Sequence, residues 1–560
     1  AFGLAGVWCR CGKYRARRGA VLLVRADCPS HLSSITMFET LLGDAQCPSL
    51  WWMGCAALAS YAIWTCLYDM YWHPLSAFPG PKLAAIGNLY EFWLDVVRDG
   101  MYIFEIGRMH EKYGPIVRIN SRELHIKDPN YYGSIYASGS RKVDKDPVTV
   151  RAFNVTTSIA ATIDHDLHRT RRAYLARYFS KRSVVGIEPM IHDRISKLCQ
   201  RLEGFLESGE AVVLDHAFGA LTADVISYHM LGEHLDFLDK PDLRTIFSEA
   251  FHSVSLIYHP SRLVPGLVAC LKKIPNSIVK AVFPPVADLG LLEIETKNRI
   301  LSYSKNQAKI GFQPAILSAL IDPDIPLEER SIDRLVDETI VFLMAGTETS
   351  SRVLSVAMFY LLNDAACLRK LREELSQLPF RPDNDYAMSQ LENLPYLTAV
   401  VHESLRLTFG TAGRLPRVAT NETLQYNGFK IPAGTPVSQA SYFLHTDPAI
   451  FPDPYSFDPE RWIKAAQDGV PLTRFLVSFT RGSRQCIGIQ LSFTEMYLTL
   501  ARIVSAFDME LYETTVRDVR MEYIRAVGYP RKPKNCINRR GEVMVKVTGR
   551  ARPPRSVHGS

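Results

Sequence analysis

The fold is decided by residues 479–488, which read Phe-Thr-Arg-Gly-Ser-Arg-Gln-Cys-Ile-Gly and precede a helix-like run from Ile489 to Val504. A thiolate is stable only near positive charge or a metal, and Arg484 stands two residues before Cys486. Cys486 also lies just before a helix N-terminus, whose free N–H groups favour an anion. Gly482 and Gly488 allow the backbone to approach something flat. The loop therefore indicates a reactive or metal-bound sulfur.

The type of metal site follows from what surrounds Cys486. No second Cys or His stands nearby, which argues against zinc and for a macrocycle that supplies the other four ligands, that is, haem with an axial thiolate. The bland alternative is a buried, inert Cys in a loop. The eleven cysteines show no spacing typical of a disulfide framework, which favours a reducing compartment.

The loop resembles that of the cytochrome P-450 family, FxxGxRxCxG, and all five fixed positions match. The resemblance covers roughly Pro74 to Val547. It implies haem b bound through the thiolate of Cys486, with Phe479, Gly482, Arg484 and Gly488 forming the loop around it.

A second pattern is Ala345-Gly-Thr-Glu-Thr-Ser350, inside an otherwise apolar helix expected over 332–362. Gly and Thr are poor residues in a helix interior, and Thr349 can donate its hydroxyl to the Ala345 carbonyl, which bends the helix and opens a groove. A kink with incidental polar residues is the alternative. The resemblance implies that the groove lies over the haem and that Glu348 and Thr349 relay protons. Four residues are expected on the substrate side: Phe342, Ala345, Gly346 and Leu415.

A third pattern is Glu403-Ser-Leu-Arg406, an i,i+3 pair on one helix face. Alone it is weak, since exposed pairs of this kind contribute only about 0.2–0.5 kcal/mol. The segment from Phe457 to Trp462 strengthens it, because it resembles the family segment whose arginine, here Arg461, joins the pair in a buried network behind the haem. The implied role is structural.

A basic helix supplies further cofactor contacts. The family usually has Trp where His168 stands, and His can donate the same hydrogen bond to a haem propionate. Arg172, Arg417 and Arg484 are expected to neutralise the two carboxylates. A solvated basic face is the simpler interpretation of the other cations, which are candidates for docking an acidic flavoprotein: Arg169, Arg171, Arg177, Lys181 and Arg182.

Composition limits the class of protein. The 560 residues are 47% hydrophobic and 22% charged, which excludes wholesale disorder, a fibre and a polytopic membrane protein. The net charge of +7 arises mostly in residues 1–36, with six basic residues and one acidic. The rest is near neutral, so nucleic acid is not an expected partner.

The pattern of apolar residues predicts a mainly α fold with small β-sheets, in one domain. Helices are expected over 97–113, 167–180, 186–207, 217–232, 332–362, 365–378 and 391–408. Strands are expected over 116–120, 123–127, 423–431 and 435–440. Between Glu249 and Asp288 no acidic residue occurs, so either an interfacial lipid contact or ordinary buried helices are expected there.

The N-terminal part predicts a membrane anchor. Residues 50–68 carry no charge, and aromatic residues flank them, so a transmembrane helix is expected over 50–72 behind a lumenal segment, 37–49. A core helix or a cleaved signal peptide are the alternatives. Residues 1–36 are interpreted as a doubtful leader that is not translated. A proline-rich hinge (73–81), a catalytic domain (82–550) and a tail (551–560) follow, which implies the endoplasmic reticulum membrane with a cytosolic body.

No nucleotide-binding motif is found, so electrons must come from another protein. The resemblance implies an NADPH-dependent flavoprotein reductase, with cytochrome b5 as a further donor. The expected function is a monooxygenase acting on an apolar small molecule. His73-Pro-Leu-Ser-Ala-Phe-Pro-Gly-Pro81 and the stretch 164–172 resemble fungal members of secondary metabolism, including sesquiterpene oxygenases of the trichodiene type. A haem-thiolate isomerase or dehydratase and a non-catalytic haem sensor are the alternatives.

Overall fold

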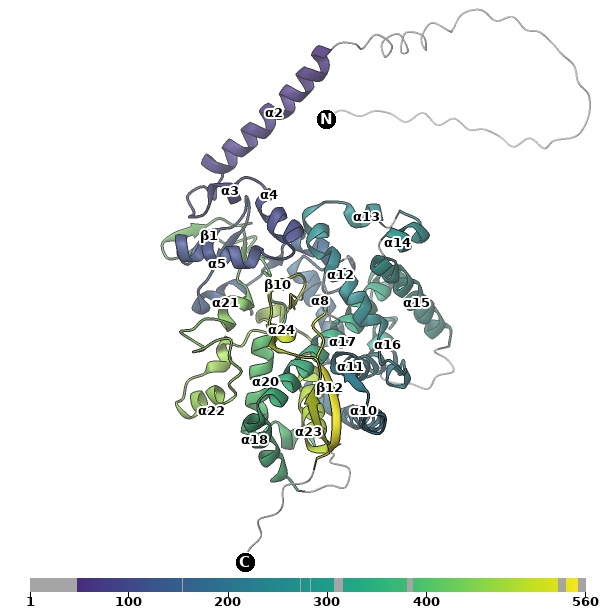
Figure 1. Ribbon diagram of the computed structural model, residues 1–560. Helices are drawn as coiled ribbons and strands as arrows, with labels where there is room; N and C mark the ends of the chain where they lie inside the picture. The colour runs from purple at the N-terminus through teal and green to yellow at the C-terminus, as the bar shows by residue number, and fades with distance from the viewer. Residues whose placement is uncertain are drawn as a thin grey trace, which may run out of the picture. The chain divides into compact units, whose positions relative to one another are not determined.

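The structure is a computed structural model that describes residues 48–139, 141–153, 155–271, 273–282, 284–306, 316–379, 386–531 and 540–551 (Figure 1). The expected leader 1–36, most of segment 37–49 and almost all of the tail lie outside these ranges. Contacts divide the chain into two units, one ending at Thr65 and one beginning at Cys66.

The expected N-terminal helix is present as α2 (Pro48–Tyr71), and its large side chains, such as Trp51, Trp52 and Trp64, are exposed. Within the described ranges, no helix taken singly has both the length and the hydropathy of a membrane span. One pair, α17 (Ile332–Asn363) with α18 (Ala365–Ser376), meets that test jointly but bends by 109° at its break. Most of α17 is buried in the core, and its place there explains the hydropathy of this pair of helices.

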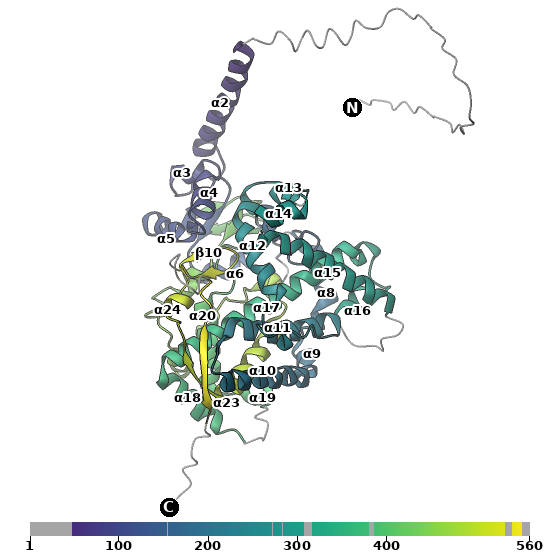
Figure 2. The same cartoon turned by 45° about the vertical axis from the view of Figure 1, so that its right-hand side comes forward.

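The body is mainly helical (Figures 1 and 2). Its longer helices are α5 (Tyr102–Tyr113), α8 (His165–Ala176), α10 (Glu188–Ser208), α11 (Leu214–Leu231), α12 (Ile246–Leu263), α15 (Pro284–Asn306), α17 (Ile332–Asn363), α18 (Ala365–Ser376), α20 (Pro395–Thr408) and α23 (Ile489–Ala506). Shorter helices used below are α3 (Lys82–Ala85), α4 (Leu89–Phe92), η1 (Trp93–Val97), α9 (Lys181–Gly186), α13 (Leu267–Leu271), α14 (Asn276–Val282) and α22 (Glu460–Gln467). All seven predicted helices are present, with ends that differ by a few residues.

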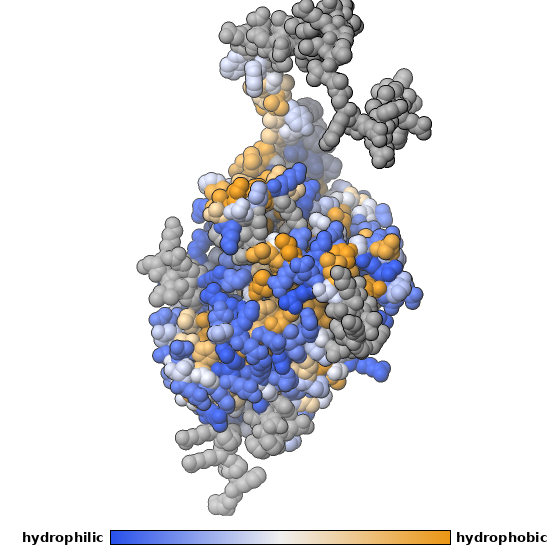
Figure 3. All heavy atoms as spheres, turned by 90° about the vertical axis from the view of Figure 1, so that its right-hand side faces the viewer, coloured by the Kyte–Doolittle hydropathy of each residue, from blue (hydrophilic) through white to orange (hydrophobic). Residues whose placement is uncertain are grey.

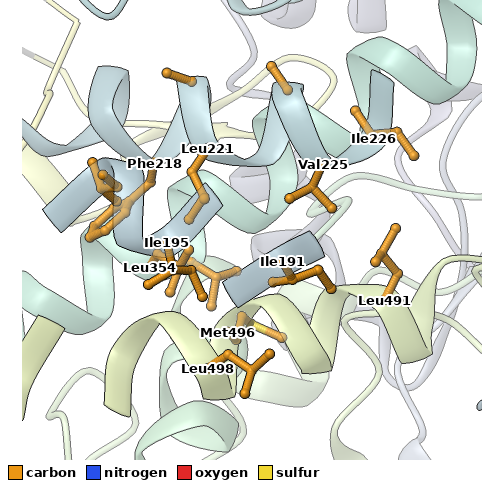
Figure 4. Close-up of a cluster of buried hydrophobic side chains, with 14 of the residues drawn as sticks. Ile191, Ile195, Phe218, Leu221, Val225, Ile226, Leu354, Leu491, Met496 and Leu498 are labelled. Atoms are coloured by element: carbon orange, nitrogen blue, oxygen red, sulfur yellow. The ribbon is translucent and has the colours of Figure 1, made fainter. Parts of the chain in front are cut away.

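Helix α17 forms the centre of the core. It packs along α11 and also contacts α12, α15, α20 and α23. Both α11 and α17 are buried over most of their length. Helix α11 is apolar on nearly all its faces, whereas α17 also buries polar residues such as Glu338, Thr347 and Ser350. Figure 4 shows the layer in which side chains of α10, α11, α17 and α23 meet, including Ile195, Leu221, Leu354 and Met496.

The strands form small sheets at the edge of the helical body. The largest has the order β1-β2-β8-β5-β3, formed by Ile116–Arg118, Leu124–Ile126, Pro436–Ser438, Arg417–Val418 and Asp144–Lys145. A three-stranded sheet joins β4 (Ala211–Val213), β12 (Met544–Arg550) and β9 (Phe507–Leu511). Two hairpins complete the set: β6 (Leu424–Tyr426) with β7 (Phe429–Ile431), and β10 (Tyr523–Ile524) with β11 (Gly528–Tyr529). The predicted class, mainly α with small sheets, is confirmed.

Two regions differ from the expectation. Segment 73–81, expected as a proline-rich hinge, is a series of turns held against the body, because Leu75 and Phe78 are buried there and Phe78 stacks on Phe429 with ring centroids 5.2 Å apart. Between Glu249 and Asp288, α12 is a largely buried helix, whereas α13, α14 and the residues around them expose Val264, Ile274, Ile278 and Val282. The interpretation as ordinary buried helices thus fits α12, and the interpretation as a lipid contact fits the exposed apolar residues of α13, α14 and their neighbours.

Candidate functional site

A cavity of about 450 Å³ lies in the body between α17, α8, the loop at Cys486, the first turns of α11 and α12 and the C-terminal segment. Several predicted residues line it: Phe479, Arg484, Cys486, Gly488, His168, Arg172, Phe342, Ala345, Gly346, Glu348 and Thr349. Residues more than 300 positions apart in the chain therefore meet around one space.

Cys486 presents its side chain to this cavity, while its N–H donates to the Phe479 carbonyl at 3.0 Å. Burial raises the pKa of the thiol, and the Gly488 backbone and the Arg172 charge oppose this. The charge that lowers the pKa of Cys486 is that of Arg172, whereas the two terminal nitrogens of Arg484 donate to the carbonyls of Thr162 and Ile163. A thiolate here therefore needs a bound metal to be stable.

The two glycines of the loop serve different purposes. Gly482 has φ +79°, and a Cβ there would lie 2.3 Å from the Ala137 carbonyl oxygen, so its close approach is to the protein's own backbone. Gly488 has φ −83°, and a Cβ there would meet nothing within 4 Å. Of the two, Gly488 lines the cavity, so it leaves room for a flat ligand beside Cys486.

A group of cations lies on one side of the cavity. Burial, followed by the charge of Arg417, lowers the pKa of Arg484 to about 10. Burial and then Arg484, Lys145 and Arg172 lower the pKa of His168 to about 2, so this imidazole is neutral and can donate one hydrogen bond. The structure thus brings three of the predicted contacts, His168, Arg172 and Arg484, to the cavity wall. The fourth, Arg417, lies behind this wall and stacks over Tyr136.

Lys145 belongs to the same group, and the sequence did not reveal it. Burial lowers its pKa well below the usual value, with Arg417 and Arg484 adding to the effect. Strand β3 pairs Lys145 with Arg417 of β5, and this register places the two cations side by side. A lone lysine in an irregular loop carries no local signal for this position.

The cation group fits a cofactor that carries two negative charges along one edge. The carboxylates that offset Arg484 are Asp144 and Asp164, and Asp164 also caps α8 by accepting the Leu167 N–H. Arg484 Nε is buried and has no hydrogen-bond partner within the described ranges. Two propionates would provide an acceptor for this buried N–H group and negative charge between cations that repel one another. The residues present therefore fit haem.

On α17, Thr349 donates to the Ala345 carbonyl at 2.9 Å, as predicted, and both side chains are exposed to the cavity. Burial, and next Asp215, raise the pKa of Glu348 to about 7. Gly346 also has a packing role, because a Cβ there would lie 2.7 Å from Ile226 Cγ1 of α11. This part of the helix therefore offers a groove with a carboxyl group that is protonated half of the time near neutral pH.

Leu415 does not line this cavity. It packs, partly buried, on the apolar cluster that contains Leu75 and Phe78. The cavity wall at the end of α20 is instead formed by residues 407–411, which the sequence did not predict.

The Glu403 network is present, with Glu403 and Arg406 fully buried and Arg461 partly buried. Arg406 donates Nε and Nη2 to the two carboxylate oxygens at 2.9 and 2.7 Å. Arg461 Nε donates to Oε1 at 3.1 Å, and Trp462 Nε1 donates to Oε2 at 2.9 Å. His445 accepts the Val477 N–H at 2.9 Å and bonds the Arg406 carbonyl at 3.0 Å, which joins the network to the start of the Cys486 loop.

The basic surface near α8 and α9 is smaller than expected. Arg171 is engaged by Glu329 at 2.8 Å and by the Thr157 carbonyl, so it is not available for docking. Lys181 pairs with Glu392 at 2.7 Å. Arg169, Arg177 and Arg182 are exposed.

No group of three or more His, Cys, Asp or Glu side chains placed to hold a metal occurs in the described part of the chain. A metal at Cys486 would therefore take its remaining ligands from a cofactor, a substrate or water.

Comparisons with known proteins agree with this geometry. The Cytochrome P450 family profile matches residues 79–536. The chain is 53% identical to "Cytochrome P450 monooxygenase TRI4" of Trichoderma arundinaceum over 490 residues, 87% of this chain and 95% of that protein. It is 49% identical to the TRI4 of Fusarium sporotrichioides (88% and 95%) and to "Cytochrome P450 monooxygenase SAT11" of Stachybotrys chartarum (88% and 93%).

Proposed function

The chain belongs to the cytochrome P450 family and is a haem-dependent monooxygenase, and we propose that it inserts one oxygen atom into an apolar terpenoid or related secondary metabolite. One observation carries this: the Cys486 side chain faces a cavity of about 450 Å³ whose wall includes Glu348 and Thr349. Phe179, Ile226 and Phe342 line the same space and favour an apolar substrate.

In the mechanism that we propose, the chain's own residues have three tasks. Cys486 would hold haem b, and His168, Arg172, Arg484 and Lys145 would bind its propionates. When bound, this group activates O2, so that one oxygen atom enters the substrate and the other leaves as water. Thr349 accepts and donates protons within the groove, and Glu348 resupplies them, because its carboxyl group is half protonated near pH 7.

The proposal is tested on the full chain in microsomes with a reductase and NADPH. Its reduced form with CO should show the absorption of a thiolate-bound haem, and a panel of terpenes and polyketides should give an oxygenated product that carries one atom of labelled O2. Cys486→Ser should abolish both signals. A product that forms without NADPH and O2 would favour an isomerase or dehydratase, and a bound pigment without turnover would favour a sensor.

The electron donor in our proposal is a flavoprotein reductase, with cytochrome b5 as a second donor, that docks on Arg169, Arg177 and Arg182. These cations are exposed, and exposed charge steers an acidic partner. Arg169→Glu with Arg182→Glu should slow reduction by the reductase about tenfold at low salt. Equal rates for the variant and the original chain would exclude this surface.

The location in our proposal is the endoplasmic reticulum membrane, with α2 as anchor and the body in the cytosol. Exposed aromatic residues on α2 support this. The body adds exposed Leu89 and Trp93 near its start, and Ile278 and Val282 on α14. Figure 3, which faces the side of the body that carries α13 to α15, shows hydrophobic groups on a mostly hydrophilic surface. Release of a chain that lacks residues 1–72 from microsomes by salt would support the anchor, and its retention would place the lipid contact in the body.

A further inference from the structure

One side of the cavity is polar, and we call it the polar arm. It is formed by the start of α11, the first turns of α12, residues 529–530, and Arg540 and Glu542 of the C-terminal segment, and it ends at Glu348 of α17. Its side chains do not belong to the cofactor contacts described above. Their number is unexpected in a cavity that takes an apolar substrate.

The ionic groups of the polar arm are paired with one another. Arg352 binds Asp215 at 2.9 Å. Arg540 binds both carboxylate oxygens of Glu249, at 2.8 and 2.9 Å. His216 Nε2 and Glu542 Oε1 are 3.0 Å apart. Because these charges compensate each other, the arm offers no site for a charged part of a substrate.

Three titratable side chains in the arm, Glu348, His252 and Tyr529, lie outside these pairs. Glu348 is hydrogen-bonded to Ser248 of α12. His252 meets the Tyr529 ring edge-on, with centroids 6.2 Å apart, and Tyr529 Oη bonds Ser255 Oγ at 2.8 Å. Burial, followed by Arg540 and Arg525, lowers the pKa of His252 to about 4, so its ring is neutral near pH 7 and can both accept and donate a proton.

The arm also reaches the surface. The side chains of Glu249 and Arg540 are 30% and 41% exposed. Ser248 and His252 are four residues apart on α12 and therefore share one helix face, directly beside Glu249. Polar side chains that line one cavity thus lie between an exposed ion pair and the buried carboxyl group of Glu348.

We propose that protons reach Glu348 from solvent through the polar arm, carried by His252 and Ser248 with intervening water, and that this route refills Glu348 after it has given a proton to Thr349. The proposal rests on the proposed function and extends it to the source of the protons. No bond other than O–H and N–H bonds changes: His252 takes a proton from water on one side and returns one toward Ser248 and Glu348 on the other.

The test uses the full chain with its cofactor bound, and it begins with a readout that does not depend on turnover. Infrared difference spectra after a pH jump record how fast the Glu348 carboxyl group takes up a proton, and Glu348→Gln identifies its band. His252→Phe combined with Ser248→Ala should slow this uptake about tenfold. His252→Gln, which keeps a hydrogen-bonding side chain, should restore much of the rate.

Ser253→Ala is the matched control, because Ser253 is on the same helix but bonds the Glu249 carbonyl and does not line the cavity. It should leave uptake unchanged. Uptake that is equally fast in the double variant and the original chain would overturn the proposal.

A second measurement separates this proposal from the function itself. With NADPH and reductase, the double variant should release more peroxide per NADPH and form about tenfold less product, while turnover driven by added hydrogen peroxide stays within about twofold. Loss of both kinds of turnover with normal infrared kinetics would overturn the route. Absence of product from the original chain would count against the proposed function and would leave the infrared result standing.

Discussion

Arg406 donates two parallel hydrogen bonds to Glu403, at 2.9 and 2.7 Å, and neither side chain has any exposed surface. Two further donors, from Arg461 and Trp462, reach the same carboxylate. Such a pair is costly to break, because the remaining partner stays buried with its charge uncompensated. Its position beside the start of the Cys486 loop connects folding to cofactor binding.

We therefore expect Glu403→Gln to reduce the free energy of unfolding by about 3–5 kcal/mol and to yield protein with little haem. Thermal unfolding and the ratio of haem to protein absorbance measure the two effects. Glu460→Gln is the control on nearby α22, since the exposed Lys370–Glu460 pair contributes less than about 1 kcal/mol. Normal haem content in Glu403→Gln would contradict this role.

The two loop glycines should respond differently to alanine. Gly482→Ala forces a left-handed residue with a Cβ against the Ala137 carbonyl, and should destabilise the fold by about 2–4 kcal/mol. Gly488→Ala should cost less than about 1 kcal/mol but should lower haem occupancy, because the added methyl group occupies space beside Cys486. Melting temperature and haem content, measured for both variants, distinguish them. Equal melting temperatures would refute the assignment.

A buried pair of histidines should make stability depend on pH. His110 Nε2 lies 2.7 Å from His125 Nδ1, and their outer nitrogens bond Gly114 O and the Ala440 N–H. This chain requires both rings to be neutral. Burial lowers the pKa of His110 to about 4 and that of His125 well below its usual value.

Because the folded pKa values lie below the unfolded value of about 6.5, the stabilisation is present above pH 6.5 and is lost as the pH falls toward 4. For His110 the loss is on the order of 3 kcal/mol. Urea unfolding of the original chain and of His110→Gln at pH 7.5 and 5 tests this. We expect the variant to lose less stability between the two pH values, and parallel losses would contradict the prediction.

An ionic cluster near the end of α12 should be a major contributor to stability. Arg262 contacts Glu91 at 2.6 Å and Asp95 at 2.7 Å, and all three are buried. Arg262→Met leaves these carboxylates short of a partner and should cost about 3–5 kcal/mol. Arg299→Met, which breaks the exposed pair with Glu295, should cost less than about 1 kcal/mol. Similar melting temperatures for both variants would show that the cluster is not essential.

Glu348 should make the coupling of the reaction, that is, the amount of product formed per NADPH, depend on pH. Burial raises the pKa of this carboxyl group to about 7, so the fraction that is protonated and can donate a proton falls as the pH rises through this range. Product formed per NADPH should therefore fall as the pH rises through 7. Glu348→Gln should lower coupling roughly tenfold at pH 6.5 and remove this step. If product per NADPH still fell through pH 7 in this variant, the pH dependence would belong to another group.

Local patterns in the sequence were sufficient to predict most of the longer helices and several residues of the candidate site. The residue types around Cys486 predicted the ligand, the i,i+3 spacing placed Glu403 and Arg406 on one helix face, and Thr349 bonds the Ala345 carbonyl as expected. These features depend on neighbours within about one helical turn, so the spacing along the chain is enough to define them.

Tertiary structure decided which distant groups meet. Strand register places Lys145 beside Arg417, Glu329 engages Arg171 across 158 positions, and α12 brings His252 to Tyr529. Packing also excluded Leu415 from the cavity and placed Arg484 against the carbonyls of Thr162 and Ile163. Such contacts depend on how whole helices and strands pack, and burial then sets the charge of each group. No pattern within a short stretch of chain contains that information.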